Sequence, residues 1–285
     1  MAIWAYPDIA SSDFPYGVKG VRVSEGSPEG RRQVNLWNES ACPFCKQDLL
    51  PVVAEKDCDI TPNPPPWPNH HESFSANVQA CILCGWWKAQ YITEWRNPGE
   101  SCVDIYQGGA SLKELDVTDL SVPIVEIRDF LVARYQQRLN IHPRLFEEVV
   151  GSVFGNLGYS AIVTGYSGDN GIDVILSSGK ETIGVQVKRY KNKIDVEQIR
   201  SLAGALVLNG LTRGIFVTTS TFESGAHSTS DRYSQRGYPI ELIDAQRFFD
   251  ALCLSQREMY RSWDEFSTLV TAKRLPLVLH LMEHY

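Results

Sequence analysis

Long apolar runs are missing from this sequence. No stretch of about 18 apolar residues occurs, so we expect no membrane-spanning helix. The N-terminus, MAIWAYPDIASSDF, lacks the basic and apolar segments of a secretory signal peptide, which together with the cysteine usage favours a cytoplasmic location. An overall excess of positive charge is missing too, because the formal net charge is −7. This balance argues against a surface that binds nucleic acid everywhere.

Cysteine is scarce, and its spacing is informative. The seven cysteines include two Cys-x-x-Cys pairs, Cys42 with Cys45 and Cys81 with Cys84, which favours metal binding over disulfides. Each pair is expected to form a tight turn, relieved after the second pair by Gly85, and four thiolates make a closed structural zinc site. Redox-active pairs and buried free thiols stay open as alternatives. Three residues of the intervening segment could also replace a ligand: His70, His71 and Cys58.

Helical periodicity is missing from the first hundred residues. Eleven of the fifteen prolines and six of the seven tryptophans lie before residue 99. The run Pro62–Pro68 can form only a loop or a polyproline II segment. We therefore predict a small, loop-rich domain over residues 1–110 that zinc staples together.

The remaining chain has a regular pattern of helices and strands. A helical linker is predicted over 111–141, with Ser121 as N-cap and Pro123 in the first turn. Beyond it the apolar spacing predicts a helix from Pro143 to Gly158, strands over 159–164, 171–176 and 182–190, a helix over 195–209, a strand over 213–219, a helix over 221–236, a strand over 239–244 and a helix from 245. This order predicts an α/β domain over 142–255, a mixed sheet flanked by helices. A helical extension over 256–285 would dock on the core or on a second subunit.

Polar residues on two neighbouring predicted strands suggest a metal site. Asp173 begins one strand, and the triplet Gln186-Val187-Lys188 lies in the next. Strand alternation places Gln186 and Lys188 on one face. Oxygen ligands for a hard cation, with a fixed positive charge beside a scissile phosphate, are what metal-dependent phosphodiester cleavage requires. Nuclease is therefore the leading hypothesis.

Further charged residues surround this triplet. On the helix from Pro143, Glu148 points roughly 155° away from the apolar face, whereas Glu147, at roughly 105°, lies on its rim. Glu147 alone is expected to reach the sheet edge, although an ordinary surface position stays open. Between residues 180 and 213 there are seven basic and three acidic residues. This segment is either a solvated strand end or a phosphate-facing surface, and we expect four of its residues to bind DNA: Arg189, Lys191, Lys193 and Arg200.

Residues 143–250 resemble the Mrr-like restriction endonuclease family of the PD-(D/E)xK superfamily. The segments that carry the resemblance are 146–148, 158–159, 169–173, 185–190, 202–204, 214–220 with Phe222, and 240–244. The resemblance implies Asp173 as principal metal ligand, Lys188 as catalytic lysine and Glu147 as helix-borne acid. It also places Gln186 in the position that Glu often holds in the superfamily. Because an amide contributes no charge, Asp169 could supply the missing carboxylate, or it could cap a turn.

The resemblance implies a Mg²⁺-dependent or Mn²⁺-dependent DNA endonuclease of prokaryotic restriction and antiphage defence. Two alternatives stay open: an inactive nuclease fold serving as a zinc-dependent DNA-binding or scaffold module, and a nuclease of junctions or transposon ends. DNA is the expected partner. A homodimer is expected from geometry, since double-strand cleavage needs two active sites, and a partner defence protein would be a further trigger that no residue identifies.

Overall fold

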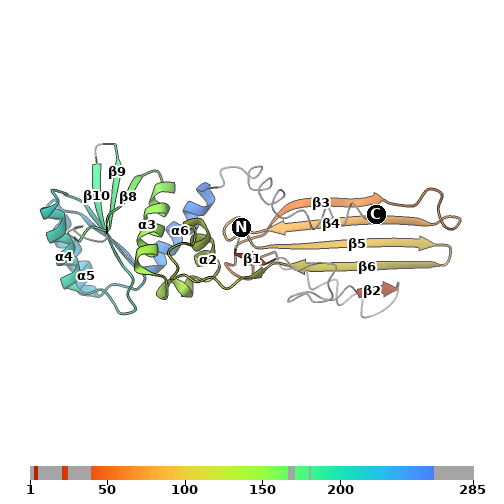
Figure 1. The fold of residues 1–285 in the computed structure, drawn as a ribbon, viewed down its shortest axis with the longest axis horizontal. Coiled ribbons are helices and arrows are strands. Elements are labelled where there is room, and N and C mark those ends of the chain that lie inside the picture. The colour runs from red at the N-terminus through yellow and green to blue at the C-terminus, as the bar shows by residue number, and fades with distance from the viewer. Residues whose placement is uncertain (1–2, 6–20, 25–39, 166–170, 180, 260–285) are drawn as a thin grey trace. The chain divides into compact units, whose positions relative to one another are not determined.

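The described residues divide into two compact units, one up to Glu114 and one from Leu115 onward. The computed structural model describes residues 3–5, 21–24, 40–165, 171–179 and 181–259 (Figure 1). Residues 260–285, which hold most of the predicted C-terminal extension, lie outside this range, as does Asp169. No helix in the described part of the chain is long and apolar enough to cross a membrane.

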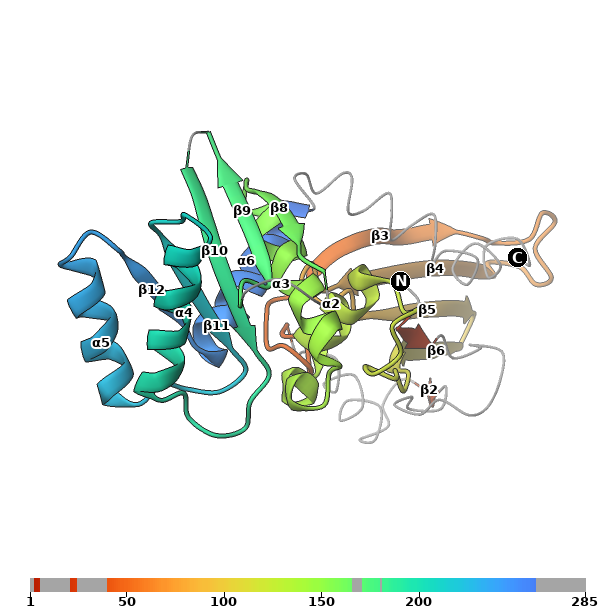
Figure 2. The ribbon, with the colours of Figure 1, turned by 60° about the vertical axis from the view of Figure 1, so that its left-hand side comes forward.

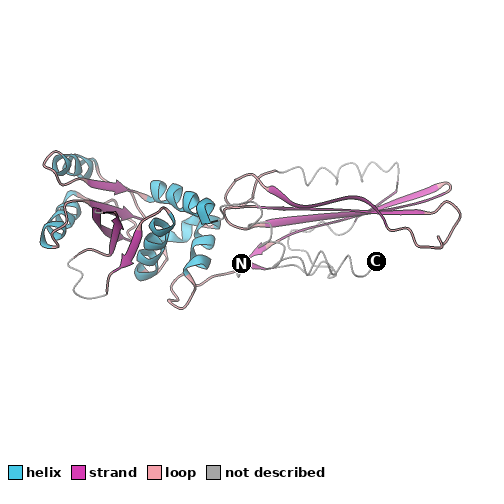
Figure 3. Cartoon of the chain, turned by 90° about the horizontal axis from the view of Figure 1, so that it is seen from above, coloured by secondary structure: helices cyan, strands magenta, loops and turns pink. Residues whose placement is uncertain are grey.

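The first unit is built on a five-stranded antiparallel sheet of order β2-β6-β5-β4-β3. Its strands are β2 (Val21–Ser24), β3 (Leu50–Asp59), β4 (His71–Ala80), β5 (Trp87–Asn97) and β6 (Glu100–Gly109). A separate two-stranded ladder joins β1 (Trp4–Ala5) to β7 (Ser111–Leu112). Within the described residues this unit contains strands and loops but no helix, as Figure 3 shows.

Among the described residues of the predicted loop-rich domain 1–110, loops and turns hold the Cys-x-x-Cys pairs and the long connection between β3 and β4. The proline-rich run lies in the loop between β3 and β4, where Trp67 is 62% exposed. By contrast, β4, β5 and β6 pair continuously from His71 to Gly109. Pro98 and Gly99 form the two-residue turn between β5 and β6, and Gly99 has a φ of 87° that favours glycine. Among the described residues, Pro98 and the proline-rich run therefore lie in turns and loops, whereas Pro51 lies within β3 at the edge of the sheet.

The second unit is an α/β domain around a mixed five-stranded sheet of order β12-β11-β10-β9-β8. Its strands are β8 (Ser160–Val163), β9 (Val174–Ser178), β10 (Glu181–Lys188), β11 (Gly214–Thr218) and β12 (Ile240–Ile243). Strands β8, β9 and β10 pair antiparallel, whereas β10, β11 and β12 pair parallel. The order and type of these strands confirm the predicted mixed sheet.

Helices cover both faces of this sheet, as Figure 2 shows. Helices α4 (Val196–Leu208) and α5 (Ser224–Ser234) contribute to an apolar cluster with Ile172, Phe216 and Leu242 on one face. On the other face α3 (Pro143–Asn156) packs against β8, β9 and β10, and α6 (Ala245–Met259) packs against β11 and β12. Phe146 of α3 and Phe248 of α6 meet edge to face at 5.3 Å between ring centroids.

The segment interpreted as a helical linker, 111–141, contains α2 (Ile124–Ala133) and the 3-10 helix η2 (Tyr135–Leu139). Helix α2 packs on α3 and α6 within the second unit. Its Arg128 is 1% exposed and donates to Ser152, Asn156 and Ser255 on those two helices. The buried polar network attaches this segment to the α/β domain.

Candidate functional site

The candidate site lies where β9 separates from β10. The antiparallel ladder joins Val174 to Val185, and the Asp173 amide donates to the Val185 carbonyl at 2.8 Å. The carboxylate Oδ2 of Asp173 accepts a hydrogen bond from the Val187 amide at 2.6 Å. Asp173 therefore lies opposite Gln186 in a continuation of the β9–β10 register. Its side chain binds the backbone of Val187, the middle residue of the Gln-x-Lys triplet.

Gln186 and Lys188 lie on the same face of β10. In the parallel ladder Gln186 pairs with Phe216 and Lys188 with Thr218, the last residue of β11. Phe216 belongs to the apolar cluster beneath α4 and α5, so the triplet's polar residues face that side. Gln186 is 5% exposed, whereas Lys188 at the strand end is half-buried. The lysine is thus the more accessible of the two.

The turn before Asp173 comes close to the Gln186 amide. Gly171 has a φ of 85°, and a Cβ at this position would lie 3.7 Å from Gln186 Nε2 and 3.3 Å from Ala205 Cβ. The left-handed backbone and the close neighbours both favour glycine here. The turn can therefore carry Asp173 directly to the triplet.

Glu147 is connected to Asp173 through Arg144, a residue that the sequence analysis overlooked. Arg144 donates to Glu147 at 3.1 Å, to Glu148 at 3.2 Å and to the Thr164 carbonyl at 2.6 Å. Thr164 in turn donates from its backbone amide and its hydroxyl to the Asp173 carbonyl, both at 3.0 Å. The spacing of Arg144 from the two glutamates, i to i+3 and i+4, was the available signal.

The predicted DNA-binding residues differ in their surroundings. Lys191 and Lys193 are exposed in the loop after β10. Arg200 is exposed and forms an ion pair with Glu197 at 2.5 Å. Arg189 is half-buried and donates to the Leu139 carbonyl at 2.8 Å, which ties the end of η2 to the segment after β10. The two lysines are therefore the more available cations for a phosphate backbone.

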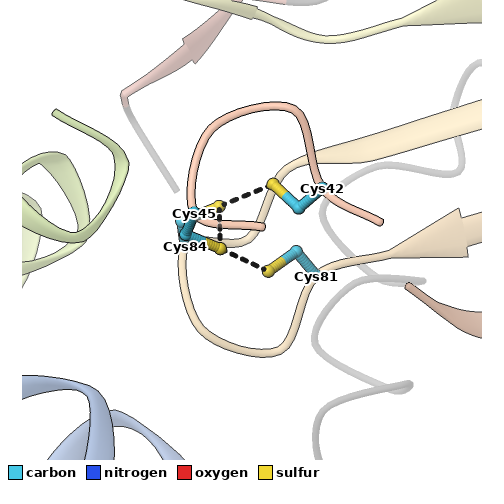
Figure 4. Close-up of side chains that lie close together, drawn as sticks. All are labelled: Cys42, Cys45, Cys81 and Cys84. Carbon is cyan, nitrogen blue, oxygen red and sulfur yellow. Dashed lines mark hydrogen bonds between the residues drawn. The ribbon is translucent and has the colours of Figure 1, made fainter. Parts of the chain in front are cut away.

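A second cluster of chemical interest lies in the first unit. The ligand atoms of Cys42, Cys45, Cys81 and Cys84 all lie within 4.8 Å of one another (Figure 4). Their sulfur–sulfur distances include 3.5 Å for Cys42–Cys84 and 3.3 Å for Cys45–Cys81. A tetrahedral centre with metal–sulfur bonds of about 2.3 Å needs sulfur atoms about 3.8 Å apart. Among the described residues, this is the one group of three or more such side chains close enough to hold a metal.

The two Cys-x-x-Cys turns have matching backbones. In the first turn the Lys46 amide donates to the Cys42 carbonyl at 3.0 Å, and in the second the Gly85 amide donates to the Cys81 carbonyl at 2.9 Å. Lys46 and Gly85 have φ values of 63° and 74°, so each turn closes with a left-handed residue. Each turn thereby points two sulfurs inward, as predicted from the spacing.

The cluster has an aromatic lining, and its thiols differ in the direction in which their pKa values are shifted. Trp4 donates from Nε1 to the Cys84 carbonyl at 2.7 Å and meets Phe44 edge to face. Burial raises the pKa of the Cys84 thiol. Hydrogen bonds lower the pKa of the Cys42 thiol, and the bond with Cys45 has the largest effect. A bound cation is what allows all four thiols to ionise together. The donor set therefore fits a soft or borderline divalent metal.

The alternative ligands considered for this cluster lie elsewhere. His70 and His71 lie at the start of β4, whereas Cys81 follows its end, and Cys58 pairs with Phe74 in the half of β4 nearer the histidines. His70 is bonded on both ring nitrogens, to Asn97 and Glu72, each at 2.7 Å. These bonds raise the pKa of His70, and the bond with Asn97 has the largest effect. A ten-residue strand separates the histidines from the four thiols, so they cannot replace a ligand there.

Comparison with known proteins finds one family model and two relatives that are similar to the α/β domain. Residues 138–252 match the Mrr_cat family model, described as restriction endonuclease. Over 137 residues the chain is 31% identical to the type IV methyl-directed restriction enzyme EcoKMrr of Escherichia coli (strain K12). The aligned region covers 45% of this chain and 44% of that protein. It is also 28% identical over 178 residues to the uncharacterized protein y4cE of Sinorhizobium fredii (strain NBRC 101917 / NGR234), covering 57% of this chain and 42% of the relative. The chain thus spans less than half the length of these relatives.

Proposed function

We propose that this chain is a metal-dependent DNA endonuclease, on the premise that residues 138–252 form an Mrr-like restriction endonuclease domain. The observation that supports the proposal is the bond from the Val187 amide to the Asp173 carboxylate, with Gln186 and Lys188 on either side of Val187 and on one face of β10. A carboxylate, an amide oxygen and an ammonium group at one strand end suit the hydrolysis of a phosphodiester bond.

Each of these residues has a distinct role in the proposal. Asp173 and Gln186 would hold Mg²⁺ or Mn²⁺, with Asp169 as a further candidate ligand. When bound, such a cation supplies a Lewis acid and lowers the pKa of coordinated water. Lys188 stabilises the negative charge that develops on the phosphate. Glu147, which forms an ion pair with Arg144, would be the helix-borne acid of the site.

DNA is the proposed substrate, and the exposed loop after β10 is its proposed contact. Lys191 and Lys193 are exposed there, and they would neutralise backbone phosphates without reading bases. Arg189 and Arg200 have protein partners, so we assign them a smaller share of DNA binding. Because one relative is named a methyl-directed restriction enzyme, methylated DNA is the first substrate to test.

The four cysteines are proposed to bind one structural zinc ion. All four positions of a tetrahedral centre would be filled by protein sulfur, which leaves no open position for catalysis. The unit would then choose or grip the DNA target that the α/β domain cuts. A homodimer would bring two active sites to opposite strands, and a partner defence protein would trigger cutting.

Cleavage assays with purified protein test the proposal directly. Plain, methylated and branched DNA of matched length are incubated with Mg²⁺, Mn²⁺ or a chelator, and binding is measured in parallel by gel shift. We expect metal-dependent cleavage of at least one substrate and none with the chelator. Binding without cleavage under every condition would favour the inactive DNA-binding or scaffold module, and cleavage of branched DNA alone would favour the junction nuclease.

A further inference from the structure

Three consecutive hydroxyl side chains at the end of β11 grip the backbone that follows Lys188. Thr218 donates from Oγ1 to the Lys188 carbonyl at 3.0 Å, and Thr219 donates from Oγ1 to the Tyr190 carbonyl at 2.8 Å. Ser220 donates from Oγ to the Lys191 carbonyl at 3.2 Å. We call Thr218, Thr219 and Ser220 the hydroxyl triplet.

The Lys188 carbonyl receives a second bond from the same strand. The Thr219 amide donates to it at 3.2 Å, so both a backbone and a side-chain donor fix this carbonyl. Thr218 Oγ1 also accepts from the Ser220 amide at 3.2 Å, which fixes the rotamer of the hydroxyl group. Thr218 and Thr219 are 0% exposed. Water therefore does not compete for these bonds, and loss of one leaves a buried polar group unpaired.

The 3-10 helix η2 binds the hydroxyl triplet from outside the sheet. Arg138 donates from Nε to the Thr219 carbonyl at 3.1 Å, and its guanidinium lies 4.7 Å from the centroid of the Tyr135 ring. Arg189 donates back to Leu139 at the end of η2. The segment 188–191 is thus fixed by β11 and by η2 together. Bonds spaced along four residues fix a backbone conformation more strongly than strand pairing alone.

From these bonds we infer that Thr218 is a positioning residue for the lysine of the active site. The inference deepens the proposed function and rests on it. A lysine side chain is long and flexible, so its reach to a phosphate depends on where its Cα is held. Thr218 fixes the peptide group of Lys188 and does not itself touch DNA. Thr219 and Ser220 fix the carbonyls of Tyr190 and Lys191. The exposed Lys191 is thereby held at a fixed position relative to Lys188, so that both lysines can contact one phosphate backbone.

Substitution of the Thr218 hydroxyl tests this role. In Thr218→Val the shape is kept, whereas the donor to the Lys188 carbonyl and the acceptor of the Ser220 amide are both lost. We expect kcat for DNA cleavage to fall about 10- to 100-fold, the cost of a misplaced catalytic group. KM for DNA should change less than about twofold, because the phosphate-binding lysines remain. Thr218→Ser keeps the hydroxyl group and should restore kcat to within about threefold of the wild type.

A structural control separates positioning from stability. Ser230 of α5 donates its buried hydroxyl to the carbonyl of Ile240, the first residue of the edge strand β12, and not to the backbone that follows Lys188. Ser230→Ala therefore removes the same kind of bond, and we expect a comparable loss in denaturant midpoint with kcat unchanged. Equal losses of kcat in Ser230→Ala and Thr218→Val would overturn the positioning role.

Hydrogen exchange gives a readout that does not depend on cleavage. In Thr218→Val the amide of Thr219, which donates to the Lys188 carbonyl, should exchange at least about tenfold faster than in wild type, as expected for local opening. Unchanged exchange at Thr219 would overturn the inference whether or not the protein cuts DNA. If wild type cuts DNA and Thr218→Val keeps full kcat, the inference alone fails. If wild type cuts no DNA under any condition, the proposed function fails and takes the catalytic role of Thr218 with it.

Discussion

At the scale of single residues, Lys188 is the side chain on which the proposed chemistry depends most. Its ammonium group would stabilise the negative charge on the scissile phosphate, and this charge is larger in the transition state than in bound DNA. Lys188→Ala should therefore lower kcat about 100- to 1,000-fold, the typical cost of removing one electrostatic contact of this kind. Single-turnover cleavage measures the effect, and circular dichroism and gel shift should show that folding and binding persist.

The matched control for Lys188 is the exposed Lys193. Lys193→Ala removes the same charge from the same segment but outside the strand. We expect weaker DNA binding and a salt dependence reduced by about one unit of slope, with the single-turnover rate at saturating DNA retained. Near-normal cleavage by Lys188→Ala would contradict the catalytic assignment.

Asp173 has two roles that substitutions can separate. Its carboxylate accepts from the buried Val187 amide, so Asp173→Ala leaves that donor unpaired and should cost about 1–3 kcal/mol in the free energy of unfolding. Asp173→Asn keeps an acceptor oxygen and loses the charge. We expect the asparagine variant to be nearly as stable as wild type, yet without cleavage at any Mg²⁺ concentration. Urea unfolding and cleavage assays test the pair, and activity in either variant would contradict Asp173 as principal metal ligand.

The substitution Gln186→Glu tests whether residue 186 is a metal ligand, because it adds the carboxylate that this position lacks. The side chain is 5% exposed beside Asp173, so Gln186→Glu places a second negative charge in a buried position. Without metal we expect the free energy of unfolding to fall by about 2 kcal/mol. Mg²⁺ should recover that loss, bind more tightly than in wild type and lower the metal concentration needed for cleavage. Thermal melting with and without Mg²⁺ measures the difference.

The control for this charge change is Gln235→Glu, at an exposed position after α5. The same substitution there should leave both the melting temperature and its Mg²⁺ dependence unchanged. An equal Mg²⁺ response in the two variants would mean that Gln186 packs in the core and holds no metal.

At the scale of elements, Arg144 links α3 to the loop beside the site. Arg144 is 18% exposed at its side chain and binds Glu147, Glu148 and the carbonyl that follows β8. Arg144→Gln should lower the free energy of unfolding by about 1–2 kcal/mol, as expected for charged hydrogen bonds that are largely buried. Arg200→Gln breaks an exposed ion pair of the same i to i+3 geometry and should cost less than about 0.5 kcal/mol. Equal costs would show that Arg144 does not anchor the helix.

The predictability of these elements follows from the kind of signal each one carries. Pro143 opens α3 and Gly158 follows its end, as the sequence predicts, because proline and glycine have fixed positions at helix ends. Most strands of the α/β domain were also predictable, since buried strands carry continuous apolar runs. The strand predicted from residue 171 instead begins at Val174, because Gly171 and Ile172 still form the turn toward Asp173.

The first unit was less predictable for a physical reason. Its strands β4 and β5 mix serine, asparagine and glutamate with aromatic residues, so neither simple alternation nor a helical period appears. The signal that sequence analysis missed was Pro98–Gly99, which fixes a tight turn between two segments that each hold a neighbouring tyrosine and isoleucine. In the site, the spacing of Arg144 from Glu147 and Glu148 was a signal that the sequence held, whereas the role of Thr218 comes from a contact made only in the folded sheet.

At the scale of the whole molecule, the two units should depend on metal to different degrees. The first unit has a buried core that centres on the four cysteines, with Trp4, Leu83 and Trp87 nearly fully buried around them. The second unit has apolar clusters on both faces of its sheet and no comparable thiol group among its described residues. We expect one zinc ion per chain, bound through Cys42, Cys45, Cys81 and Cys84. Metal analysis of the purified protein measures the content directly.

Removal of that zinc should unfold one unit and spare the other. Because binding energy of a structural zinc ion is folding energy, a strong chelator or the double substitution Cys42→Ser and Cys81→Ser should melt the first unit. Tryptophan fluorescence follows this change, since six of the seven tryptophans lie before residue 99. Far-ultraviolet circular dichroism should keep the helical signal of the second unit. Cys253→Ser, which changes a cysteine of α6 outside the cluster, should keep zinc and both transitions. Full zinc content in the double variant, or loss of both units together on chelation, would contradict a zinc centre confined to the first unit.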